Sequence, residues 1–330
     1  MDNPETMTPA NDRRLEQARD WLHGLGVKVP NGFHAVAGDA SFRRYFRLQA
    51  DGMSRILMDA PPPGEDVRPF IDIDQRLRSS GLHAPDVFHA DVENGFVLLE
   101  DLGDELYRDL LEPISATSHF PKLFGVLESM ATEVDARGLA KFDDAALRAE
   151  MNLFPDWYLD HHRSQLPRAR FDLVWEEFCG HIIASAQEQP QCFVHRDFHS
   201  CNLLKTPGNT VGIIDFQDAV SGPLSYDFIS LIWDRYISWP REQIEEWMES
   251  FRQMLDLDIR PLHWQRYCDL MGLQRNIKVV GIFARLYYRD SKSGYIEMIP
   301  RFYDYVTTTL RRYPEFSELL DILEKTECAP

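Results

Sequence analysis

The spacing of hydrophobic and polar residues along the chain changes close to residue 100. Between Phe33 and Glu100, short runs of aromatic and β-branched residues alternate with turn residues, which is typical of strands. Beyond Glu100, apolar residues recur at helical spacing over long stretches, as they do in amphipathic helices. The pattern therefore predicts an α+β protein with two lobes, a small β-rich N-terminal lobe and a larger helical C-terminal lobe.

Turn and capping residues divide both lobes into elements. Strands are expected at residues 33–37, 41–48, 55–58, 87–90 and 96–99, and helices at 11–24, 66–80, 120–137, 144–162, 173–187, 241–255 and 264–289. A short insert at 193–227, with strand–loop–strand character, interrupts the helices. We expect an N-terminal helical extension at 1–30, the β-rich lobe at 31–100 and the helical lobe at 101–330.

Length and charge narrow the classes of function. The chain has 330 residues, with 35 Lys plus Arg against 53 Asp plus Glu, so its formal net charge is −18. This balance argues against binding to a nucleic-acid backbone or to an anionic membrane surface. A nucleotide site remains open, because one nucleotide needs only a local group of donors. Nothing in the composition indicates an obligate protein partner.

The cysteines and the apolar runs predict where the protein resides. Five cysteines are widely spaced and form no C-x-x-C pair, which fits free thiols in a reducing compartment. The first residues are polar and lack the apolar core of a secretory signal. No apolar run reaches the roughly 18 residues of a membrane span. We therefore expect a cytoplasmic protein.

One segment carries the candidate chemistry. The triplet His195-Arg196-Asp197 is followed by Asn202, and Asp215 closes an apolar strand. This order is the H-R-D-x-x-x-x-N and metal-aspartate pattern of protein-kinase-like phosphotransferases. Phosphoryl transfer from ATP needs a carboxylate beside the attacking hydroxyl and oxygen ligands for Mg²⁺. The catalytic loop at 193–204 and the metal motif at 211–218 therefore predict a kinase that uses ATP and Mg²⁺, with Asp197 as base and with Asn202 and Asp215 as metal ligands.

The residues around this motif resemble the aminoglycoside phosphotransferase and choline kinase superfamily, which uses a protein-kinase-like fold on small molecules. The resemblance rests on His199, on Asn202-Leu203-Leu204 and on residues 214–218. Four further segments, at 38–47, 58–63, 153–159 and 274–286, are similar to one bacterial group within it. That group phosphorylates the anomeric C1 hydroxyl of N-acetylmuramate and N-acetylglucosamine in peptidoglycan recycling. The resemblance implies the same reaction for this chain.

The resemblance also implies roles for residues outside the catalytic loop. His195 and Asp227 would be structural, with Asp227 tying the catalytic loop to the helix that follows it. Backbone groups around Glu100 and Leu102 would bind the adenine. The lysine usual on the third strand is absent, since Met58 stands in its place. A cation that faces phosphate is still expected on electrostatic grounds, and the candidates are Arg43 and Arg44, which follow the turn at 38–41. Ser41, in that turn, is a further nucleotide-binding candidate.

The acceptor is expected beside Asp197 in the helical lobe. Aromatic rings stack on sugar faces, carboxylates accept hydroxyl hydrogen bonds, and a muramate carboxylate would need a cation such as Arg275 or Lys278. The candidate wall residues are His199, Glu150, Trp157, Tyr158, Arg275, Lys278 and Arg285. Core packing explains the two aromatic residues equally well, and the cations could equally be solvated or paired inside the lobe. His199 either positions the acceptor or shapes the loop.

Two alternatives remain at this point. The chain could be a kinase of another small alcohol, of the aminoglycoside, choline or homoserine type. It could also be a catalytically silent, pseudokinase-like binding protein, for which Met58 is the best support. The intact Asp197, Asn202 and Asp215 oppose that second alternative. The sequence leaves open the choice of sugar and anomer, the cation that replaces the lysine, and the oligomeric state.

Overall fold

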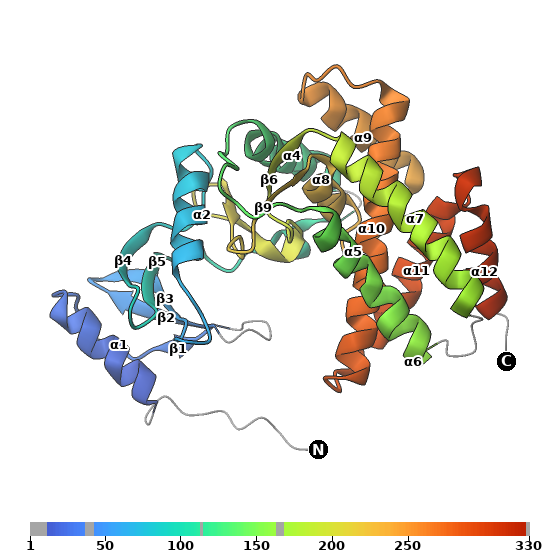
Figure 1. Ribbon diagram of the computed structural model, residues 1–330. Coiled ribbons are helices and arrows are strands. Elements are labelled where there is room, and N and C mark those ends of the chain that lie inside the picture. The colour runs from blue at the N-terminus through green and yellow to red at the C-terminus, as the bar shows by residue number, and fades with distance from the viewer. Residues whose placement is uncertain (1–11, 37–42, 113–114, 163–167, 328–330) are drawn as a thin grey trace. The chain divides into compact units, whose positions relative to one another are not determined.

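A computed structural model describes residues 12–36, 43–112, 115–162 and 168–327 (Figure 1). The chain divides into two compact units. The N-terminal unit comprises Met1–Tyr107 and Leu203–Asp218, and the helical unit comprises Arg108–Asn202 and Ala219–Pro330. The hairpin that carries the metal motif thus belongs to the N-terminal unit, whereas the sequence assigned it to the helical lobe.

An antiparallel sheet forms the centre of the N-terminal unit. Among the described residues it has five strands in the order β1-β2-β3-β5-β4. They are β1 (His34–Ala35), β2 (Arg44–Ala50), β3 (Met53–Asp59), β4 (Val87–Asp91) and β5 (Phe96–Glu100). Asp51 and Gly52 turn β2 into β3 with φ of 49° and 83°, the left-handed pair that a tight hairpin requires. This register sets Tyr45 opposite Met58 and Arg44 opposite Asp59.

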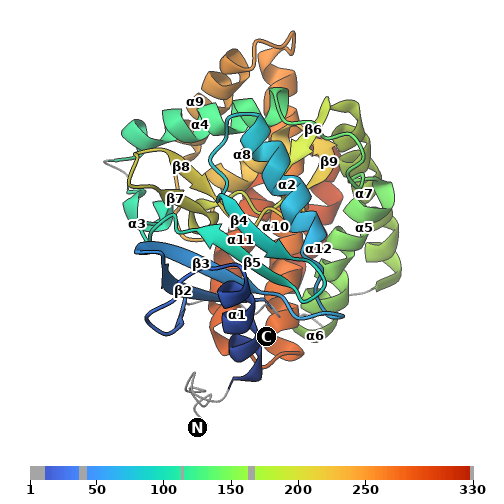
Figure 2. The ribbon, with the colours of Figure 1, turned by 90° about the vertical axis from the view of Figure 1, so that its left-hand side faces the viewer.

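In the described part of the N-terminal unit, two longer helices lie beside the sheet. In α1 (Arg13–Gly24) the residues Leu15, Ala18 and Leu22 are buried in one cluster with sheet residues, and α1 lies along the sheet (Figure 2). The Asp12 carboxylate caps α1 by accepting from the backbone N–H groups of Arg14 and Leu15, at 2.9 and 3.4 Å. The second helix, α2 (Arg68–Ser79), carries Phe70, whose ring packs against Phe216 with 4.8 Å between centroids.

A second, short hairpin completes the N-terminal unit. Its strands are β7 (Leu203–Lys205) and β8 (Val211–Ile213), and isolated bridges join it to Leu106 and His83. Gly212 packs closely here, and a Cβ at this position would lie 3.0 Å from a Leu102 methyl group. The hairpin therefore fixes the backbone from which Asp215 and Phe216 project.

The helical unit is organised around its longest helix, α10 (Pro261–Tyr288), which packs against several others (Figure 1). The elements before it are α3 (Tyr107–Leu110), α4 (Ala116–Thr132), α5 (Asp144–Leu153), α6 (Asp160–His162), α7 (Arg168–Glu188), β6 (Gln191–Val194), β9 (Val220–Pro223), α8 (Ser225–Ile232) and α9 (Arg241–Met254). After it come α11 (Ile299–Leu310) and α12 (Ser317–Glu327). Gly281 lets α10 cross the backbone of Leu153 closely, because a Cβ there would overlap it.

The helix predicted over 144–162 is interrupted. A π-helical turn at Phe154–Leu159 separates α5 from α6. Pro155 has no N–H to continue the α-helical ladder, so the helix widens at this point. Trp157 and Tyr158 lie in the widened turn.

The predicted α+β architecture, with a small β-rich unit and a larger helical unit, is confirmed. None of the helices in the described ranges has both the length and the apolar character to cross a bilayer. The cysteines Cys179, Cys192, Cys201 and Cys268 are free thiols, and Cys328 lies outside the described residues.

Candidate active site

The catalytic loop follows β6 and is held at its start by Asp227. The Asp227 carboxylate, in the first turn of α8, accepts from the backbone N–H groups of His195 and Arg196 at 2.6 and 3.0 Å. Burial raises the pKa of Asp227 to about 7, although these two hydrogen bonds act in the opposite direction. Arg196 takes a left-handed backbone conformation, with φ of 75°, that a non-glycine residue adopts at some cost. The two hydrogen bonds stabilise the loop in that conformation.

The far end of the loop is held by residues within the helical unit. Ser200 donates its backbone N–H to the buried Asp234 carboxylate at 2.7 Å. Asn202 donates from Nδ2 to the Asp197 carbonyl oxygen at 2.9 Å. The Asp197 backbone is thus fixed from inside the loop itself. Asp234 was missed by the sequence analysis, and the only signal for it is an acidic residue placed directly after an apolar helix.

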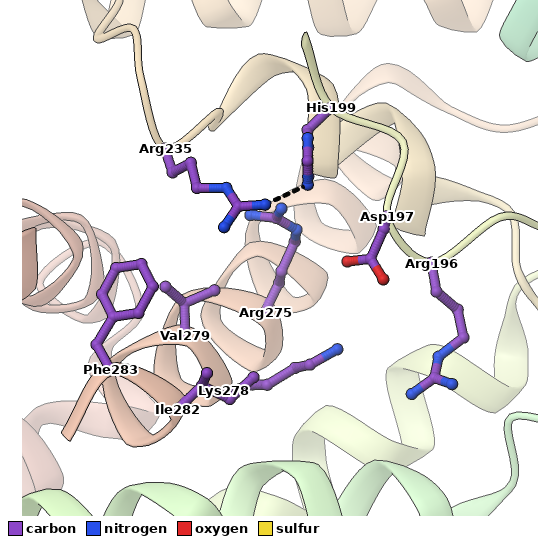
Figure 3. A pocket seen from close by; sticks show the side chains of 9 residues that line it. All are labelled: Arg196, Asp197, His199, Arg235, Arg275, Lys278, Val279, Ile282 and Phe283. Carbon is purple, nitrogen blue, oxygen red and sulfur yellow. Dashed lines mark hydrogen bonds between the residues drawn. The ribbon is translucent and has the colours of Figure 1, made fainter. Parts of the chain in front are cut away.

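A cavity of about 80 Å³ lies beside Asp197 within the helical unit (Figure 3). Its wall combines polar groups of the catalytic loop with one face of α10. Figure 3 shows the Asp197 carboxylate and the guanidinium groups of Arg235 and Arg275 pointing toward one another across this space. The lining residues are Arg196, Asp197, His199, Arg235, Arg275, Lys278, Val279, Ile282 and Phe283.

Asp197 stays ionised in this cavity. Burial acts to raise the pKa of its carboxyl, but the nearby charges, of which Lys278 has the largest effect, hold that pKa below its ordinary value. The side chain is therefore a carboxylate at neutral pH. Such a group can accept a hydrogen bond, and in a reaction a proton, from a hydroxyl placed in the cavity.

Glu150, predicted as an acceptor contact, is surrounded by groups of the chain itself. Its carboxylate is 9% exposed and accepts from Arg196 Nη2 at 2.6 Å, Lys278 Nζ at 3.0 Å and Gln274 Nε2 at 3.0 Å. These partners hold the pKa of Glu150 below its ordinary value against the effect of burial. Glu150 does not line the cavity and instead holds the two cations that do.

The predicted aromatic walls also lie elsewhere in the helical unit. Tyr158 is 2% exposed and belongs to the core, where its ring lies 5.3 Å from that of Phe154. Trp157 is half-buried and stacks on His161 at 5.2 Å. Neither ring lines the cavity, and neither does Arg285. Of the predicted acceptor residues, the structure brings His199, Arg275 and Lys278 together with Asp197.

His199 contacts a residue that the sequence analysis missed. Its Nε2 accepts a hydrogen bond from Arg235 Nη2 at 2.6 Å. Burial, followed by the Arg235 charge, lowers the pKa of His199 well below its ordinary value, so the ring is neutral. Because Nε2 accepts, the ring proton lies on Nδ1. Arg235 lies in an irregular segment after α8, where no motif marks it.

The predicted metal ligands are hard oxygen donors from two segments. Asp215 is exposed, with φ of 64°, and accepts from Gln217 Nε2 at 2.9 Å. The amide nitrogen of Asn202 is directed to the Asp197 carbonyl, which leaves the amide oxygen as the end that suits a hard cation. In the described part of the chain, no three His, Cys, Asp or Glu side chains gather into a metal cluster. One carboxylate and one amide fit Mg²⁺, which is commonly held by few protein ligands together with phosphate.

The two arginines predicted for phosphate binding have different surroundings. Arg44 donates from Nε to Asp59 Oδ2 at 3.0 Å and also pairs with Asp12, which joins α1 to the sheet. Arg43 donates from Nε to Glu65 Oε2 at 2.9 Å. Burial raises the pKa of Tyr45 to about 12, and the charges of Arg43 and of Asp215 both act on this phenol. Arg43 and Asp215 thus both lie near the Tyr45 phenol, whereas Arg44 pairs with Asp12 and Asp59.

The structure describes most of the other residues considered for nucleotide binding. Glu100, at the end of β5, lies 3.2 Å from His83 Nε2 and accepts from the backbone N–H of Asp86. Leu102 is buried. Met58, in the usual position of the lysine, is buried with no exposed surface. Ser41 lies outside the described residues.

Fold and catalytic loop together are those of a kinase-like phosphotransferase that acts on small molecules. The chain belongs to the phosphotransferase enzyme family, whose model matches residues 32–267. It is 39% identical to the N-acetylmuramate/N-acetylglucosamine kinase of Pseudomonas aeruginosa, over 95% of this chain and 97% of that protein. It is 35% identical to the protein of the same name from Neisseria meningitidis, over 94% of this chain and 95% of that protein. These findings confirm the family and the class of enzyme predicted from the sequence.

Solved structures agree with the fold. The choline kinase LicA from Streptococcus pneumoniae has a TM-score of 0.62 at 13% identity, covering 89% of this chain and 98% of that one. The ADP-bound aminoglycoside phosphotransferase APH(2'')-Ib has a TM-score of 0.59 at 14% identity, covering 88% and 97%. At such low identity these two structures show the fold alone.

Proposed function

We propose that this protein is an ATP-dependent kinase that phosphorylates the anomeric C1 hydroxyl of N-acetylmuramate, N-acetylglucosamine or both, in the recycling of cell-wall sugars. The observation that carries the proposal is the ionised Asp197 carboxylate at a cavity of the helical unit. It occurs in a chain that is similar, over almost its full length, to two kinases named for these sugars. ATP as the donor also suits the cytoplasmic location expected from the sequence.

In this proposal Asp197 orients the acceptor hydroxyl and takes its proton. The hydroxyl would sit in the cavity and donate a hydrogen bond to the carboxylate, which Lys278 and Arg275 keep ionised. His199 is not the base, because its Nε2 already accepts from Arg235. Asp227 and His195 act on the shape of the loop, and Asp227 does so through the two backbone hydrogen bonds that it accepts.

Mg²⁺ would be held by Asn202 and Asp215, whose oxygen atoms are the ligand type that this ion prefers. When bound, it neutralises the charge that develops on the transferring phosphoryl group. Arg43 is the cation that takes over part of the role of the missing lysine, because it and Asp215 both act on the Tyr45 phenol, while Arg44 pairs with Asp12 and Asp59. Backbone groups near Glu100 and Leu102, together with Ser41, would bind the rest of the nucleotide.

Phosphorus NMR of the product formed from N-acetylmuramate, ATP and Mg²⁺ tests the proposal. We expect a sugar phosphate whose phosphorus couples to the anomeric proton, and the same result with N-acetylglucosamine if both sugars are acceptors. A phosphate at another hydroxyl would contradict the proposed position. ADP release with choline, homoserine or an aminoglycoside, and not with either sugar, would favour the other small-alcohol kinases. Nucleotide binding without ADP release on any acceptor would favour a silent binding protein.

A further inference from the structure

The cavity beside Asp197 has an excess of positive charge. Its wall carries four cationic side chains and one carboxylate. Two of the cations, Arg196 and Lys278, share the buried Glu150 carboxylate at 2.6 and 3.0 Å. For Arg235 and Arg275, no carboxylate oxygen of the described residues lies within 4.0 Å.

Arg275 shows the imbalance most clearly. Its side chain projects from α10, is 5% exposed and donates to the Trp233 carbonyl oxygen at a long 3.4 Å. Burial lowers the pKa of Arg275, and the Tyr226 phenol, followed by the more distant carboxylates of Asp197 and Asp234, compensates for that effect only in part. A guanidinium offers five N–H donors, and a buried one is stable only when a counter-charge or hydrogen-bond acceptors satisfy it. An anion in the cavity would supply both.

Arg235 is held in place to meet such an anion. His199 accepts from Nη2 at 2.6 Å, the Tyr236 ring centroid lies 5.4 Å from the guanidinium carbon, and Arg301 Nη1 donates to the Arg235 carbonyl oxygen at 2.7 Å. Side chain and backbone are therefore both positioned before any ligand arrives. A planar guanidinium fixed in this way suits the bidentate binding of a carboxylate or a phosphate.

The apolar part of the wall favours a carboxylate of the acceptor over a phosphate of the donor. The face of α10 that lines the cavity also carries three apolar side chains, Val279, Ile282 and Phe283. They lie close to the guanidinium groups of Arg235 and Arg275. A phosphoryl group has no apolar atoms to place against them, whereas a carboxylate on a short branched carbon chain has. The cavity measures about 80 Å³, well above the roughly 10–15 Å³ that one water needs, so it accepts a group of several atoms.

We propose that Arg235, together with Arg275, binds a carboxylate carried by the acceptor, and so sets the preference of the enzyme for an acidic amino sugar over a neutral one. This inference rests on the proposed function. N-acetylmuramate carries such a carboxylate on a branched ether substituent, and N-acetylglucosamine does not. His199 is the positioning residue, because its Nε2 holds the guanidinium in place.

The test compares the two sugars on Arg235→Gln. We expect KM for N-acetylmuramate to rise between about tenfold and about a hundredfold, with kcat little changed, because a charge-assisted hydrogen bond is lost in both ground and transition state. KM and kcat for N-acetylglucosamine should each change less than about threefold. A change of that size is within the variation expected from any substitution at a distant site. Arg311→Gln, which removes an exposed arginine paired with Glu324 in the same unit, is the matched control and should affect neither sugar.

Two further variants separate positioning from folding. Arg235→Lys keeps the charge without the planar group and should recover part of the affinity for N-acetylmuramate. His199→Asn should weaken the binding of N-acetylmuramate and not that of N-acetylglucosamine, because the Arg235 guanidinium loses the hydrogen bond that holds it in place. Calorimetric titration of N-acetylmuramate in the absence of nucleotide should reproduce the order wild type, Arg235→Lys, Arg235→Gln.

The outcomes are distinguishable. Equal losses for both sugars with Arg235→Gln would overturn the inference and assign Arg235 to a group that the two reactions share, such as the donor phosphate. In that case the proposed function would still stand. Turnover of neither sugar by the wild-type protein would remove the proposed function and, with it, this inference.

Discussion

Arginine side chains serve different purposes in the two units. In the N-terminal unit, Arg14 from α1 and Arg44 from β2 both pair with the buried Asp59 of β3, so the charges bind secondary-structure elements together. In the helical unit, Arg235 and Arg275 face a cavity and have no carboxylate of the described residues within 4.0 Å. Arginines matched by carboxylates hold the fold together, whereas unmatched arginines at a cavity indicate where a ligand supplies the missing charge.

The strongest test of this contrast removes the one carboxylate of the cavity wall. We expect Asp197→Asn to lower kcat by about 10²–10⁴-fold, the usual contribution of a positioned general base, while the fold is retained. The measurement is ADP release at saturating sugar and ATP, with thermal unfolding followed in parallel. Asp321→Asn, at an exposed position of α12, should leave kcat unchanged. Undiminished turnover by Asp197→Asn would refute its role as base.

The second test asks whether Glu150 is a structural anchor. Glu150→Gln leaves the partly buried Arg196 and Lys278 near one another without their carboxylate, and we expect it to lower the free energy of unfolding by about 3 kcal/mol. Chemical denaturation measures this loss. The control is Glu176→Gln, whose exposed carboxylate pairs with Arg148 at 2.8 Å and should cost about 1 kcal/mol or less. Similar losses in both variants would contradict the anchoring role.

The third test uses two neighbouring arginines of the N-terminal unit. Arg43→Ala should raise KM for ATP about tenfold, since a charge-assisted contact to phosphate is lost. Because it also breaks the ion pair with Glu65 at 2.9 Å, the free energy of unfolding should fall by about 1 kcal/mol as well, so KM for ATP is the quantity that separates the two variants. Arg44→Ala should leave KM for ATP unchanged and lower the free energy of unfolding by about 1 kcal/mol, because its half-exposed network with Asp12 and Asp59 ties α1 to the sheet. The reverse pattern would mean that Arg44 is the phosphate ligand.

The catalytic loop could be recognised from the sequence because its chemistry requires fixed residue types at fixed spacing. The residues that hold this loop in place, Asp234 and Arg235, could not be recognised in the same way. Asp234 contacts Ser200 across 34 positions, and Arg235 contacts His199 across 36, from a segment without regular periodicity. Such contacts are created by tertiary packing, so no local pattern encodes them.

The prediction of secondary structure from the sequence was limited in the same way. Most helices and strands were predicted from their apolar spacing and turn residues, but α11 and α12 were not, although α11 is as amphipathic as the predicted α2. Trp157 and Tyr158 were proposed as wall residues because aromatic rings stack on sugar faces, and they were placed on one helix with Glu150. The π turn at Phe154–Leu159 alters which side chains share a face, so a 3.6-residue period could not place them.

The smallest expected effect concerns Asp74, a carboxylate of the N-terminal unit that has no matching arginine within bonding distance. Its side chain is buried in α2, one carboxylate oxygen has no hydrogen-bond partner in the described structure, and burial raises its pKa to about 7. Folding therefore favours the protonated form. The stability of the wild-type protein should fall as the pH rises from about 4, the pKa of an unfolded aspartate, to about 7.

Asp74→Asn removes this titration and keeps the shape of the side chain. We expect the variant to equal or exceed the wild type in stability by about 1 kcal/mol above pH 7, with the difference declining toward pH 4. Urea denaturation at a series of pH values measures it. Asp74 does not line the cavity beside Asp197, and its Oδ1 has no hydrogen-bond partner in the described structure. We therefore expect its charge to affect folding only, so that KM for ATP and KM for the sugar stay constant. A substrate-dependent effect would show that an unmatched charge in this unit also belongs to a site, and the contrast between the two units would fail.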